Sequence, residues 1–218
     1  PECLQRVLLP RFDVVLTYDV GNGIRIERGG ELVTEWQGYK QSADLPKSPR
    51  AAGEWLPHYF RYCANLRRLG RQRLHVACII REANLVAPVQ SAGNTDVNAL
   101  ALLMRDWSSE PLLAEHSLAT FLLTENLSDL HPLLATNPRA ERIKVPLPDG
   151  PVLTRALEAV ASRYPVALSD FADRLDRFAT ALQGTSLNAV ESLLKLKQYR
   201  AEPIRPEDLV LLKKELVE

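Results

Sequence analysis

The sequence has few cysteines, and they lack the spacing of a disulfide framework or a zinc site. Its three cysteines, Cys3, Cys63 and Cys78, are far apart, and none belongs to a C-x-x-C pair. An odd number of separated cysteines is typical of reduced thiols in a cytosolic protein rather than of a secreted domain held by disulfides. We therefore expect free thiols and a cytoplasmic location.

A net charge is also lacking. Lys+Arg and Asp+Glu both total 27, so no overall field draws the chain to nucleic acid or to an anionic membrane surface. Aromatic residues make up only 6% of the sequence, which disfavours a platform that stacks single-stranded nucleic acid. No apolar run approaches the roughly 18 residues of a membrane-spanning helix. We expect neither nucleic acid nor a membrane among the partners.

Motifs of known catalytic chemistry are missing as well. The sequence contains no G-x-S-x-G, no H-E-x-x-H and no Cys/His pairing that would indicate hydrolysis. It also contains no G-x-x-x-x-G-K-[ST] loop, whose backbone N–H groups cradle the phosphates of a nucleotide. The nearest pattern, Gly21-Asn22-Gly23, has no lysine and no following helix, and we interpret it as a turn. No metal site is predicted, because none of the histidines has the spacing of metal ligands: His58, His75, His116 and His131.

The composition is that of an ordinary globular protein, with 46% apolar and 25% charged residues. The 218 residues lie between one and two average domains. Two apolar runs, at residues 74–80 and 118–123, predict buried parallel strands that helices cover on both faces. Helices are predicted at residues 54–69 and in the stretch that follows a cap at Thr95 or Asp96. Strand and helix thus alternate, which predicts an α/β sheet layered with helices.

The first part of the chain predicts shorter elements. Residues 12–18 predict a strand that ends at a turn. Residues 24–27 and 32–36 flank Gly29 and Gly30 and predict a β-hairpin, because paired glycines tolerate the positive φ of a tight turn. Residues 37–53 carry two prolines and several small polar residues, and they predict a loop.

The pattern changes after residue 149. From there on, helical periodicity recurs with no strand-like alternation between the segments, which are residues 152–161, 168–182, 186–198 and 206–217. We therefore predict two domains: an α/β core at residues 1–149 and an all-helical subdomain at residues 150–218.

Polar residues stand at the end of each predicted buried strand. Arg81 and Glu82 follow the first strand, and Thr124 follows the second. Two short motifs come next: Leu130-His131-Pro132-Leu133-Leu134 and Arg139-Ala140-Glu141-Arg142. Together these features resemble the second half of an AAA+ ATPase domain of the classic AAA type, whose core is a P-loop-NTPase-like parallel sheet.

The resemblance implies a role for each of these residues. Glu82 is similar to the water-activating carboxylate of a Walker B strand, and Thr124 is similar to the sensor that binds the γ-phosphate. Arg81 stands where the family keeps an aspartate that orients Mg²⁺, and a cation so close to a dication costs a few kcal/mol at ~5 Å and an effective dielectric of ~20. Arg139 and Arg142 resemble arginine fingers, which grip the phosphate oxygens of a neighbouring subunit's nucleotide.

The helical region carries a second match. Residues 180–190 resemble the Thr-x-Gly-x-Ser-Gly-Ala-Asp-Leu stretch of the AAA lid, which implies that the helical subdomain is such a lid. Ser186 is expected to cap the helix that follows, and Pro206 is expected in the first turn of the last helix. Leu187-Asn188-Ala189 replaces the family's Gly-Ala-Asp, which places the usual contact to the adenine side in doubt.

The resemblance implies a nucleotide-hydrolysis-deficient module of a larger AAA+ ATPase that serves the assembly or regulation of a ring. Residues 14–26 are similar to the inactive N-terminal domain of bacterial and plastid tandem-AAA proteins. ATP and Mg²⁺ are then expected cofactors of the parent protein, with none for this chain alone, and other AAA+ domains in a homo-oligomer are the expected partners. Two alternatives remain open. The chain is a truncated part of an active domain whose phosphate loop lies upstream of Pro1, or it is a protein-interaction domain that binds no nucleotide.

Overall fold

The computed structural model describes residues 9–40, 44–66, 68–89, 94–171 and 174–215. The chain divides into two compact units with separate hydrophobic cores: the α/β unit, Pro1–Arg142, and the helical unit, Ile143–Glu218. We expected a boundary between residues 149 and 150. The division lies between residues 142 and 143, and the first helix of the helical unit, α8 (Gly150–Val160), begins at residue 150.

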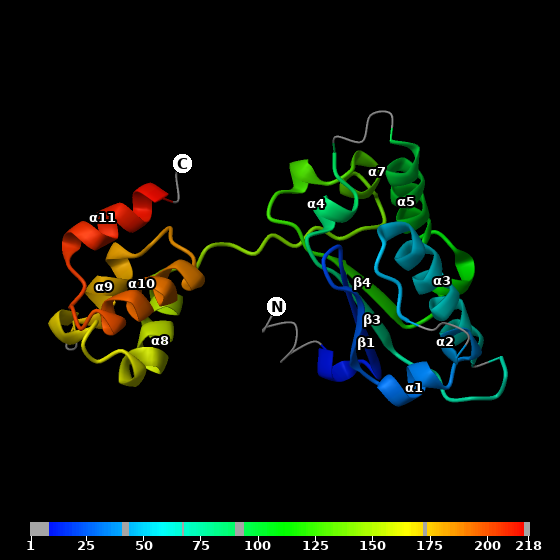
Figure 1. Ribbon diagram of the computed structural model, residues 1–218, viewed down its shortest axis with the longest axis horizontal. Coiled ribbons are helices and arrows are strands. Elements are labelled where there is room, and N and C mark those ends of the chain that lie inside the picture. The colour runs from blue at the N-terminus through cyan, green and yellow to red at the C-terminus, as the bar shows by residue number, and fades with distance from the viewer. Residues whose placement is uncertain (1–8, 41–43, 67, 90–93, 172–173, 216–218) are drawn as a thin grey trace. The chain divides into compact units, whose positions relative to one another are not determined.

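A four-stranded sheet in the order β2-β1-β3-β4 forms the centre of the α/β unit (Figure 1). Its strands are β1 (Val14–Asp19), β2 (Gly23–Arg28), β3 (Val76–Ile80) and β4 (Leu118–Leu122). Strands β1, β3 and β4 run parallel, and β2 returns antiparallel beside β1. The predicted α/β fold is confirmed, and the two apolar runs of the sequence are neighbouring strands of one sheet.

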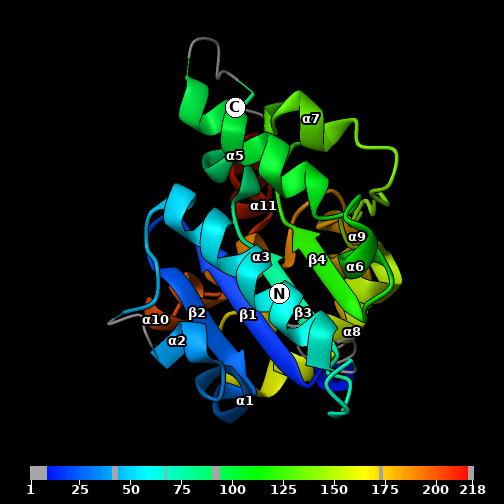
Figure 2. The same cartoon turned by 90° about the vertical axis from the view of Figure 1, so that its right-hand side faces the viewer.

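The helices that contribute to the core of the α/β unit pack on one face of its sheet (Figures 1 and 2). This face is built from alternate strand residues such as Leu16, Cys78 and Leu118. The helices on it are α1 (Gly30–Thr34), α3 (Pro49–Leu66), α4 (Ala83–Val86), α5 (Thr95–Asp106), α6 (Pro111–Ala114) and α7 (Pro132–Ala135).

The opposite face of the sheet forms a smaller cluster. Val15, Ala77 and Ile79 are buried there against Leu9, which lies in a short 3-10 turn, η2 (Leu9–Arg11). Phe12, Phe121 and Leu123 pack partly on the same cluster. We expected helices on both faces of β3, and that expectation is wrong for the described residues of the α/β unit. On this face, β3 is buried by the short turn η2 and by the side chains of Phe12, Phe121 and Leu123.

The predicted hairpin at Gly29-Gly30 is wrong. Residues 23–28 form β2, which pairs with β1 from Leu16↔Ile26 to Asp19↔Gly23, and residues 30–34 form α1. Gly29 has a φ of +73°, and a Cβ there would lie 2.4 Å from the Asp13 carbonyl oxygen. This glycine therefore serves a close approach to β1 at the start of a helix, and the hairpin turn is the one at residues 20–22.

The predicted loop at residues 37–53 is only partly a loop. A short helix, α2 (Gln37–Lys40), lies in its first part, and α3 begins at Pro49 rather than at residue 54. Ser48 caps α3, because its hydroxyl accepts from the Ala51 N–H at 3.3 Å, and proline suits the first helical position. The cap of α5 is likewise Asn94, whose side chain accepts from the Val97 N–H, and not Thr95 or Asp96.

The helical unit contains α8, α9 (Leu175–Ala181), α10 (Leu187–Tyr199) and α11 (Pro206–Glu215). Ser186 caps α10 as predicted, since its hydroxyl accepts from the Ala189 N–H at 3.2 Å. The single helix predicted at residues 168–182 is wrong. A 3-10 turn, η5 (Ser169–Phe171), stands apart from α9, and it lets Phe171 stack on Phe178 with ring centroids 4.6 Å apart.

The structure also bears on the expectations about the cysteines and about membrane-spanning helices. Cys63 and Cys78 are free thiols in the core, and burial raises the pKa of each to about 12, while Cys3 lies outside the described residues. Among the helices of the described ranges, none has both the length and the apolar character needed to cross a membrane.

Candidate functional site

The carboxyl ends of β1, β3 and β4 meet at one edge of the sheet, because these strands are parallel. In open α/β sheets this edge is where ligands bind. Three segments of the chain reach it: the turn after β1, Arg81 and Glu82 after β3, and Thr124 after β4. It is therefore the candidate site in the α/β unit.

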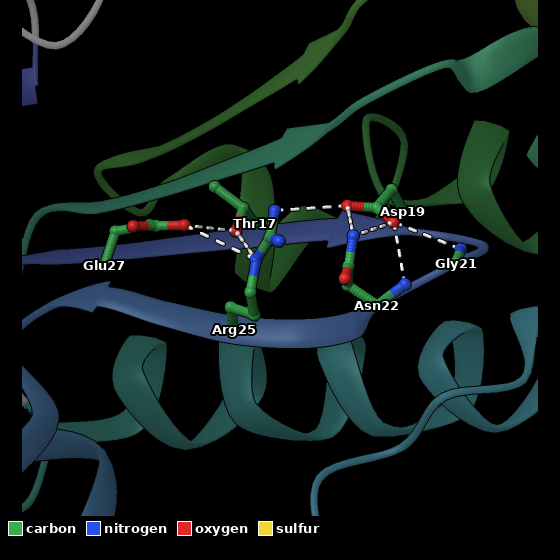
Figure 3. Close-up of polar contacts among 6 residues, drawn as sticks. All are labelled: Thr17, Asp19, Gly21, Asn22, Arg25 and Glu27. Carbon is green, nitrogen blue, oxygen red and sulfur yellow. Dashed lines mark hydrogen bonds and ion pairs between the residues drawn. The ribbon is translucent and has the colours of Figure 1, made fainter.

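The turn after β1 is organised by the carboxylate of Asp19 (Figure 3). Asp19 Oδ1 accepts from the N–H groups of Gly21 at 3.1 Å and Asn22 at 2.8 Å, and also from the Asn22 side chain at 2.8 Å. Arg25 donates to Asp19 Oδ2 at 3.1 Å. Burial opposes the charge of Asp19, but the bonds from Asn22 and the charge of Arg25 outweigh it and hold the pKa of this carboxyl below its usual value.

This arrangement is unlike a phosphate-binding loop. Such a loop points backbone N–H groups at the nucleotide and then enters a helix. Here the N–H groups of Gly21 and Asn22 are used by Asp19, whose negative charge would repel a phosphate. The chain then continues as β2 rather than as a helix. The turn predicted at Gly21-Asn22-Gly23 is confirmed, with Gly23 at a φ of +76°.

We expect Asp19→Ala to lower the free energy of unfolding of the α/β unit by about 1–3 kcal/mol, since a charged acceptor of several hydrogen bonds is lost. Asp19→Asn is the matched control. It keeps an oxygen for the turn N–H groups and loses the 3.1 Å bond that the Asn22 side chain donates to Oδ2. It also loses the ion pair with half-exposed Arg25, which is worth roughly 1 kcal/mol or less. Urea unfolding measures both. Equal losses in the two variants would show that the turn hydrogen bonds contribute nothing.

Arg81 and Glu82 leave the sheet directly after β3, and both are exposed. The Arg81 N–H donates to the Tyr18 carbonyl at 2.8 Å, so its backbone continues the ladder to β1. Glu82 has a φ of +47°, a left-handed conformation that costs a residue other than glycine about 1 kcal/mol or more. In the described part of the chain, neither side chain has a hydrogen bond or an ion pair. Both charges are therefore open to solvent at the candidate site.

Thr124 lies beside this segment. Its hydroxyl donates to the Asn126 carbonyl at 2.9 Å and lies 3.3 Å from Asn84 Oδ1, and the Ala83 N–H donates to the Leu123 carbonyl at 2.8 Å. A hydroxyl has one hydrogen, so Thr124 would have to leave Asn126 in order to donate to a phosphate oxygen. Sequence reasoning missed Asn84, although a polar residue two positions after Glu82 was a signal for it.

Arg139 and Arg142 are tied to other parts of the α/β unit. Arg139 Nη1 donates to the Ser108 carbonyl at 3.0 Å, just beyond α5, and Arg142 Nη2 donates to the Ala135 carbonyl at 2.7 Å, at the end of α7. Both residues are exposed, and each guanidinium has five N–H donors. Among the described residues, no hydrogen bond or ion pair joins either arginine to Glu82 or Thr124. The structure thus brings Glu82 and Thr124 to one edge, while the two arginines bond to Ser108 and Ala135.

His131 of the Leu-His-Pro motif has a structural position. Its side chain is 7% exposed, and its Nδ1 accepts from the Leu133 N–H at 3.2 Å, which caps α7. Nε2 must then carry the hydrogen and donate to Asn98 Oδ1 at 3.0 Å. Within the described ranges, no group of three or more His, Cys, Asp and Glu side chains is placed to hold a metal ion.

A family model described as AAA+ chaperone, N-terminal Rossmann-like domain, matches residues 1–146, about two thirds of the chain. No match to this chain was found among curated proteins.

Proposed function

The chain belongs to the family of AAA+ chaperones with an N-terminal Rossmann-like domain, and on that premise we propose that it is an AAA+ module that does not itself hydrolyse ATP. The observation that carries the proposal is the turn after β1. Its N–H donors bind the carboxylate of Asp19, and the chain returns as β2. A triphosphate would therefore meet a negative charge at this turn instead of free N–H donors.

The residues after β3 support the same conclusion. Hydrolysis by a P-loop ATPase needs a carboxylate that orients Mg²⁺ and a second one that activates water. Exposed Arg81 takes the first position, and its charge opposes a divalent cation. Glu82 is then left to activate water without the acidic partner that would orient the metal.

The role that fits such a module is the assembly or regulation of a ring of AAA+ domains. Its partners are other AAA+ domains, in a homo-oligomer of the parent protein, in the cytoplasm. ATP and Mg²⁺ bind a neighbouring domain, and Arg139 and Arg142 of this module help to complete that neighbour's site. Both arginines are exposed on the α/β unit and keep N–H donors beyond their bonds to Ser108 and Ala135, which supports this role.

We expect the purified chain to release phosphate from Mg²⁺-ATP no faster than buffer does. Glu82→Gln, which removes the candidate base, should leave that background unchanged, and a coupled phosphate-release assay measures both. Turnover near 1 per second, within the range of ordinary enzymes, that disappears in Glu82→Gln would show instead an active ATPase site at the edge of this sheet.

A further inference from the structure

The positive charge of this chain is unevenly distributed along the sequence. Residues 55–81 contain six arginines and no acidic residue, although the whole chain carries 27 residues of each sign. Arg61 is paired with an acidic side chain at 2.8 Å, Arg81 stands at the candidate site, and Arg67 lies outside the described residues. The other three belong to the connection between α3 and β3: Arg68, Arg71 and Arg73.

This connection is a defined turn that projects from the α/β unit (Figure 1). The Leu66 carbonyl, at the end of α3, accepts from the N–H groups of Leu69 at 3.1 Å and Arg71 at 2.9 Å. Gly70 lies between them with a φ of +70°, and a Cβ built there would meet no atom within 4 Å. The turn therefore favours glycine, and its outer side is open. Leu74, which is 7% exposed, anchors the other end of the turn in the core.

The arginines of this turn have no acidic partner in the described part of the chain. Arg68 and Arg71 are exposed, and neither side chain has a hydrogen bond or an ion pair there. Arg73 Nη2 donates to the Glu115 carbonyl at 3.1 Å, which leaves the charge of its guanidinium unpaired. Each guanidinium has five N–H donors in a planar fork that matches the two oxygens of a carboxylate. The turn thus presents three positive charges with free donors.

An apolar side chain is exposed among these charges. Leu69 follows Arg68 directly and is 69% exposed. A single exposed leucine is ordinary on a protein surface. Between unpaired arginines, however, it favours a partner that supplies both anionic groups and an apolar side chain. A nucleic-acid backbone supplies phosphates alone, and residues 68–74 include no aromatic side chain on which a base could stack.

We propose that residues 68–73, the basic turn, form a docking surface for an acidic peptide segment of a partner protein. The carboxylates of the segment accept from the forks of Arg68 and Arg71, and an apolar residue of the segment covers Leu69. Arg73 adds a third positive charge. The basic turn precedes β3, whereas Glu82 follows the carboxyl end of this strand. A partner can therefore bind here without occupying the candidate site.

Fluorescence anisotropy of a labelled Glu-Glu-Leu-Glu-Glu-Leu-Glu-Glu peptide tests the proposal on the full chain. We expect a Kd on the order of 10–100 µM at about 50 mM salt. Binding should weaken roughly tenfold at about 300 mM salt, because salt screens exposed charges. Arg68→Glu/Arg71→Glu should weaken it by about tenfold or more, because two charge-assisted contacts are lost and two repulsive charges replace them.

Arg177→Glu/Lys213→Glu is the matched control. It changes the net charge by the same amount through two exposed residues of the helical unit, and it should leave the Kd within about twofold of the wild type. Arg68→Lys/Arg71→Lys keeps the charge and loses the planar fork, so it should weaken binding by only about threefold. Circular dichroism reports whether each variant is folded.

Leu69→Ser tests the apolar part of the surface separately. It should weaken binding of the leucine-bearing peptide by about fivefold, because part of a leucine side chain is no longer covered. A second peptide, with serine in place of both leucines, should bind Leu69→Ser and the wild type equally. A surface that reads charge alone would instead show no difference between the two peptides.

Four results would overturn the proposal. The first is a wild-type chain that does not bind the leucine-bearing peptide at low salt. The second is a folded Arg68→Glu/Arg71→Glu variant that binds as tightly as the wild type. The third is an equal loss in the matched control, since this would show an effect of net charge alone. The fourth is tighter binding of single-stranded RNA or of phosphatidylserine vesicles through the same arginines, which would assign the basic turn to phosphate groups.

Discussion

Arg139→Ala and Arg142→Ala are each expected to slow ATP hydrolysis in an assembly where a neighbouring AAA+ domain turns over nucleotide. The loss reaches about 10³-fold if the arginine stabilises the transition state as a finger does. The physical reason is that a guanidinium stays charged and binds phosphate oxygens in a bidentate manner. Steady-state phosphate release by the assembled protein measures the effect.

The structure also gives each arginine a local bond, to Ser108 or to Ala135, and this offers a second explanation for any loss. An exposed hydrogen bond to a carbonyl contributes roughly 1 kcal/mol to stability. The control is therefore the urea unfolding of the same variants. Lys in place of Arg142 serves as a second control, because it keeps the charge and loses the planar fork. Unchanged turnover together with a stability loss of about 1 kcal/mol would assign both arginines to the fold alone.

Phe60→Ala and Phe178→Ala are expected to destabilise different halves of the protein, each by about 3–5 kcal/mol. Phe60 is fully buried in the α/β unit and meets Trp107 edge to face at 5.6 Å. Phe178 is 1% exposed in the helical unit and stacks on Phe171. A loss of this size is a large fraction of the 5–15 kcal/mol that typically stabilises a domain.

Thermal or urea unfolding should therefore show two transitions, of which each substitution shifts one. Phe60→Leu and Phe178→Leu are matched controls, since swaps between apolar residues of similar volume usually cost less than about 1.5 kcal/mol. The effects of the two alanine variants should add in the double variant, because the two cores share no residue. If either alanine substitution moved both transitions equally, the two units would unfold as one.

The elements that sequence reasoning placed best are those whose signal is local. The apolar runs before Arg81 and Thr124 predicted β3 and β4, and they predicted that the polar residues would stand where each strand ends. The cap at Ser186 was equally local, since a serine before a helical period can satisfy only the nearest free N–H groups. For the candidate site, parallel pairing was enough to bring Glu82 and Thr124 to the same edge.

The error at the hairpin occurred where two local patterns competed for one strand. Both Gly21-Asn22-Gly23 and Gly29-Gly30 can form a turn, and the sequence does not rank them. Pairing with β1 decided between them, because Ile24 and Ile26 become buried or half-buried only if the chain reverses at the first site. Gly29 was then free to start α1.

The sequence by itself determined the α/β class of the first unit, the helical character of the second, and the lack of a lysine-bearing phosphate loop. These follow from periodicity and residue type, which are properties of short segments. Only the tertiary structure decided that the described helices of the α/β unit cover one face of its sheet, that Asp19 uses the turn N–H groups, and that Arg139 and Arg142 bond to Ser108 and Ala135. Each of these depends on contacts between segments brought together only by folding, whose energies no local pattern contains.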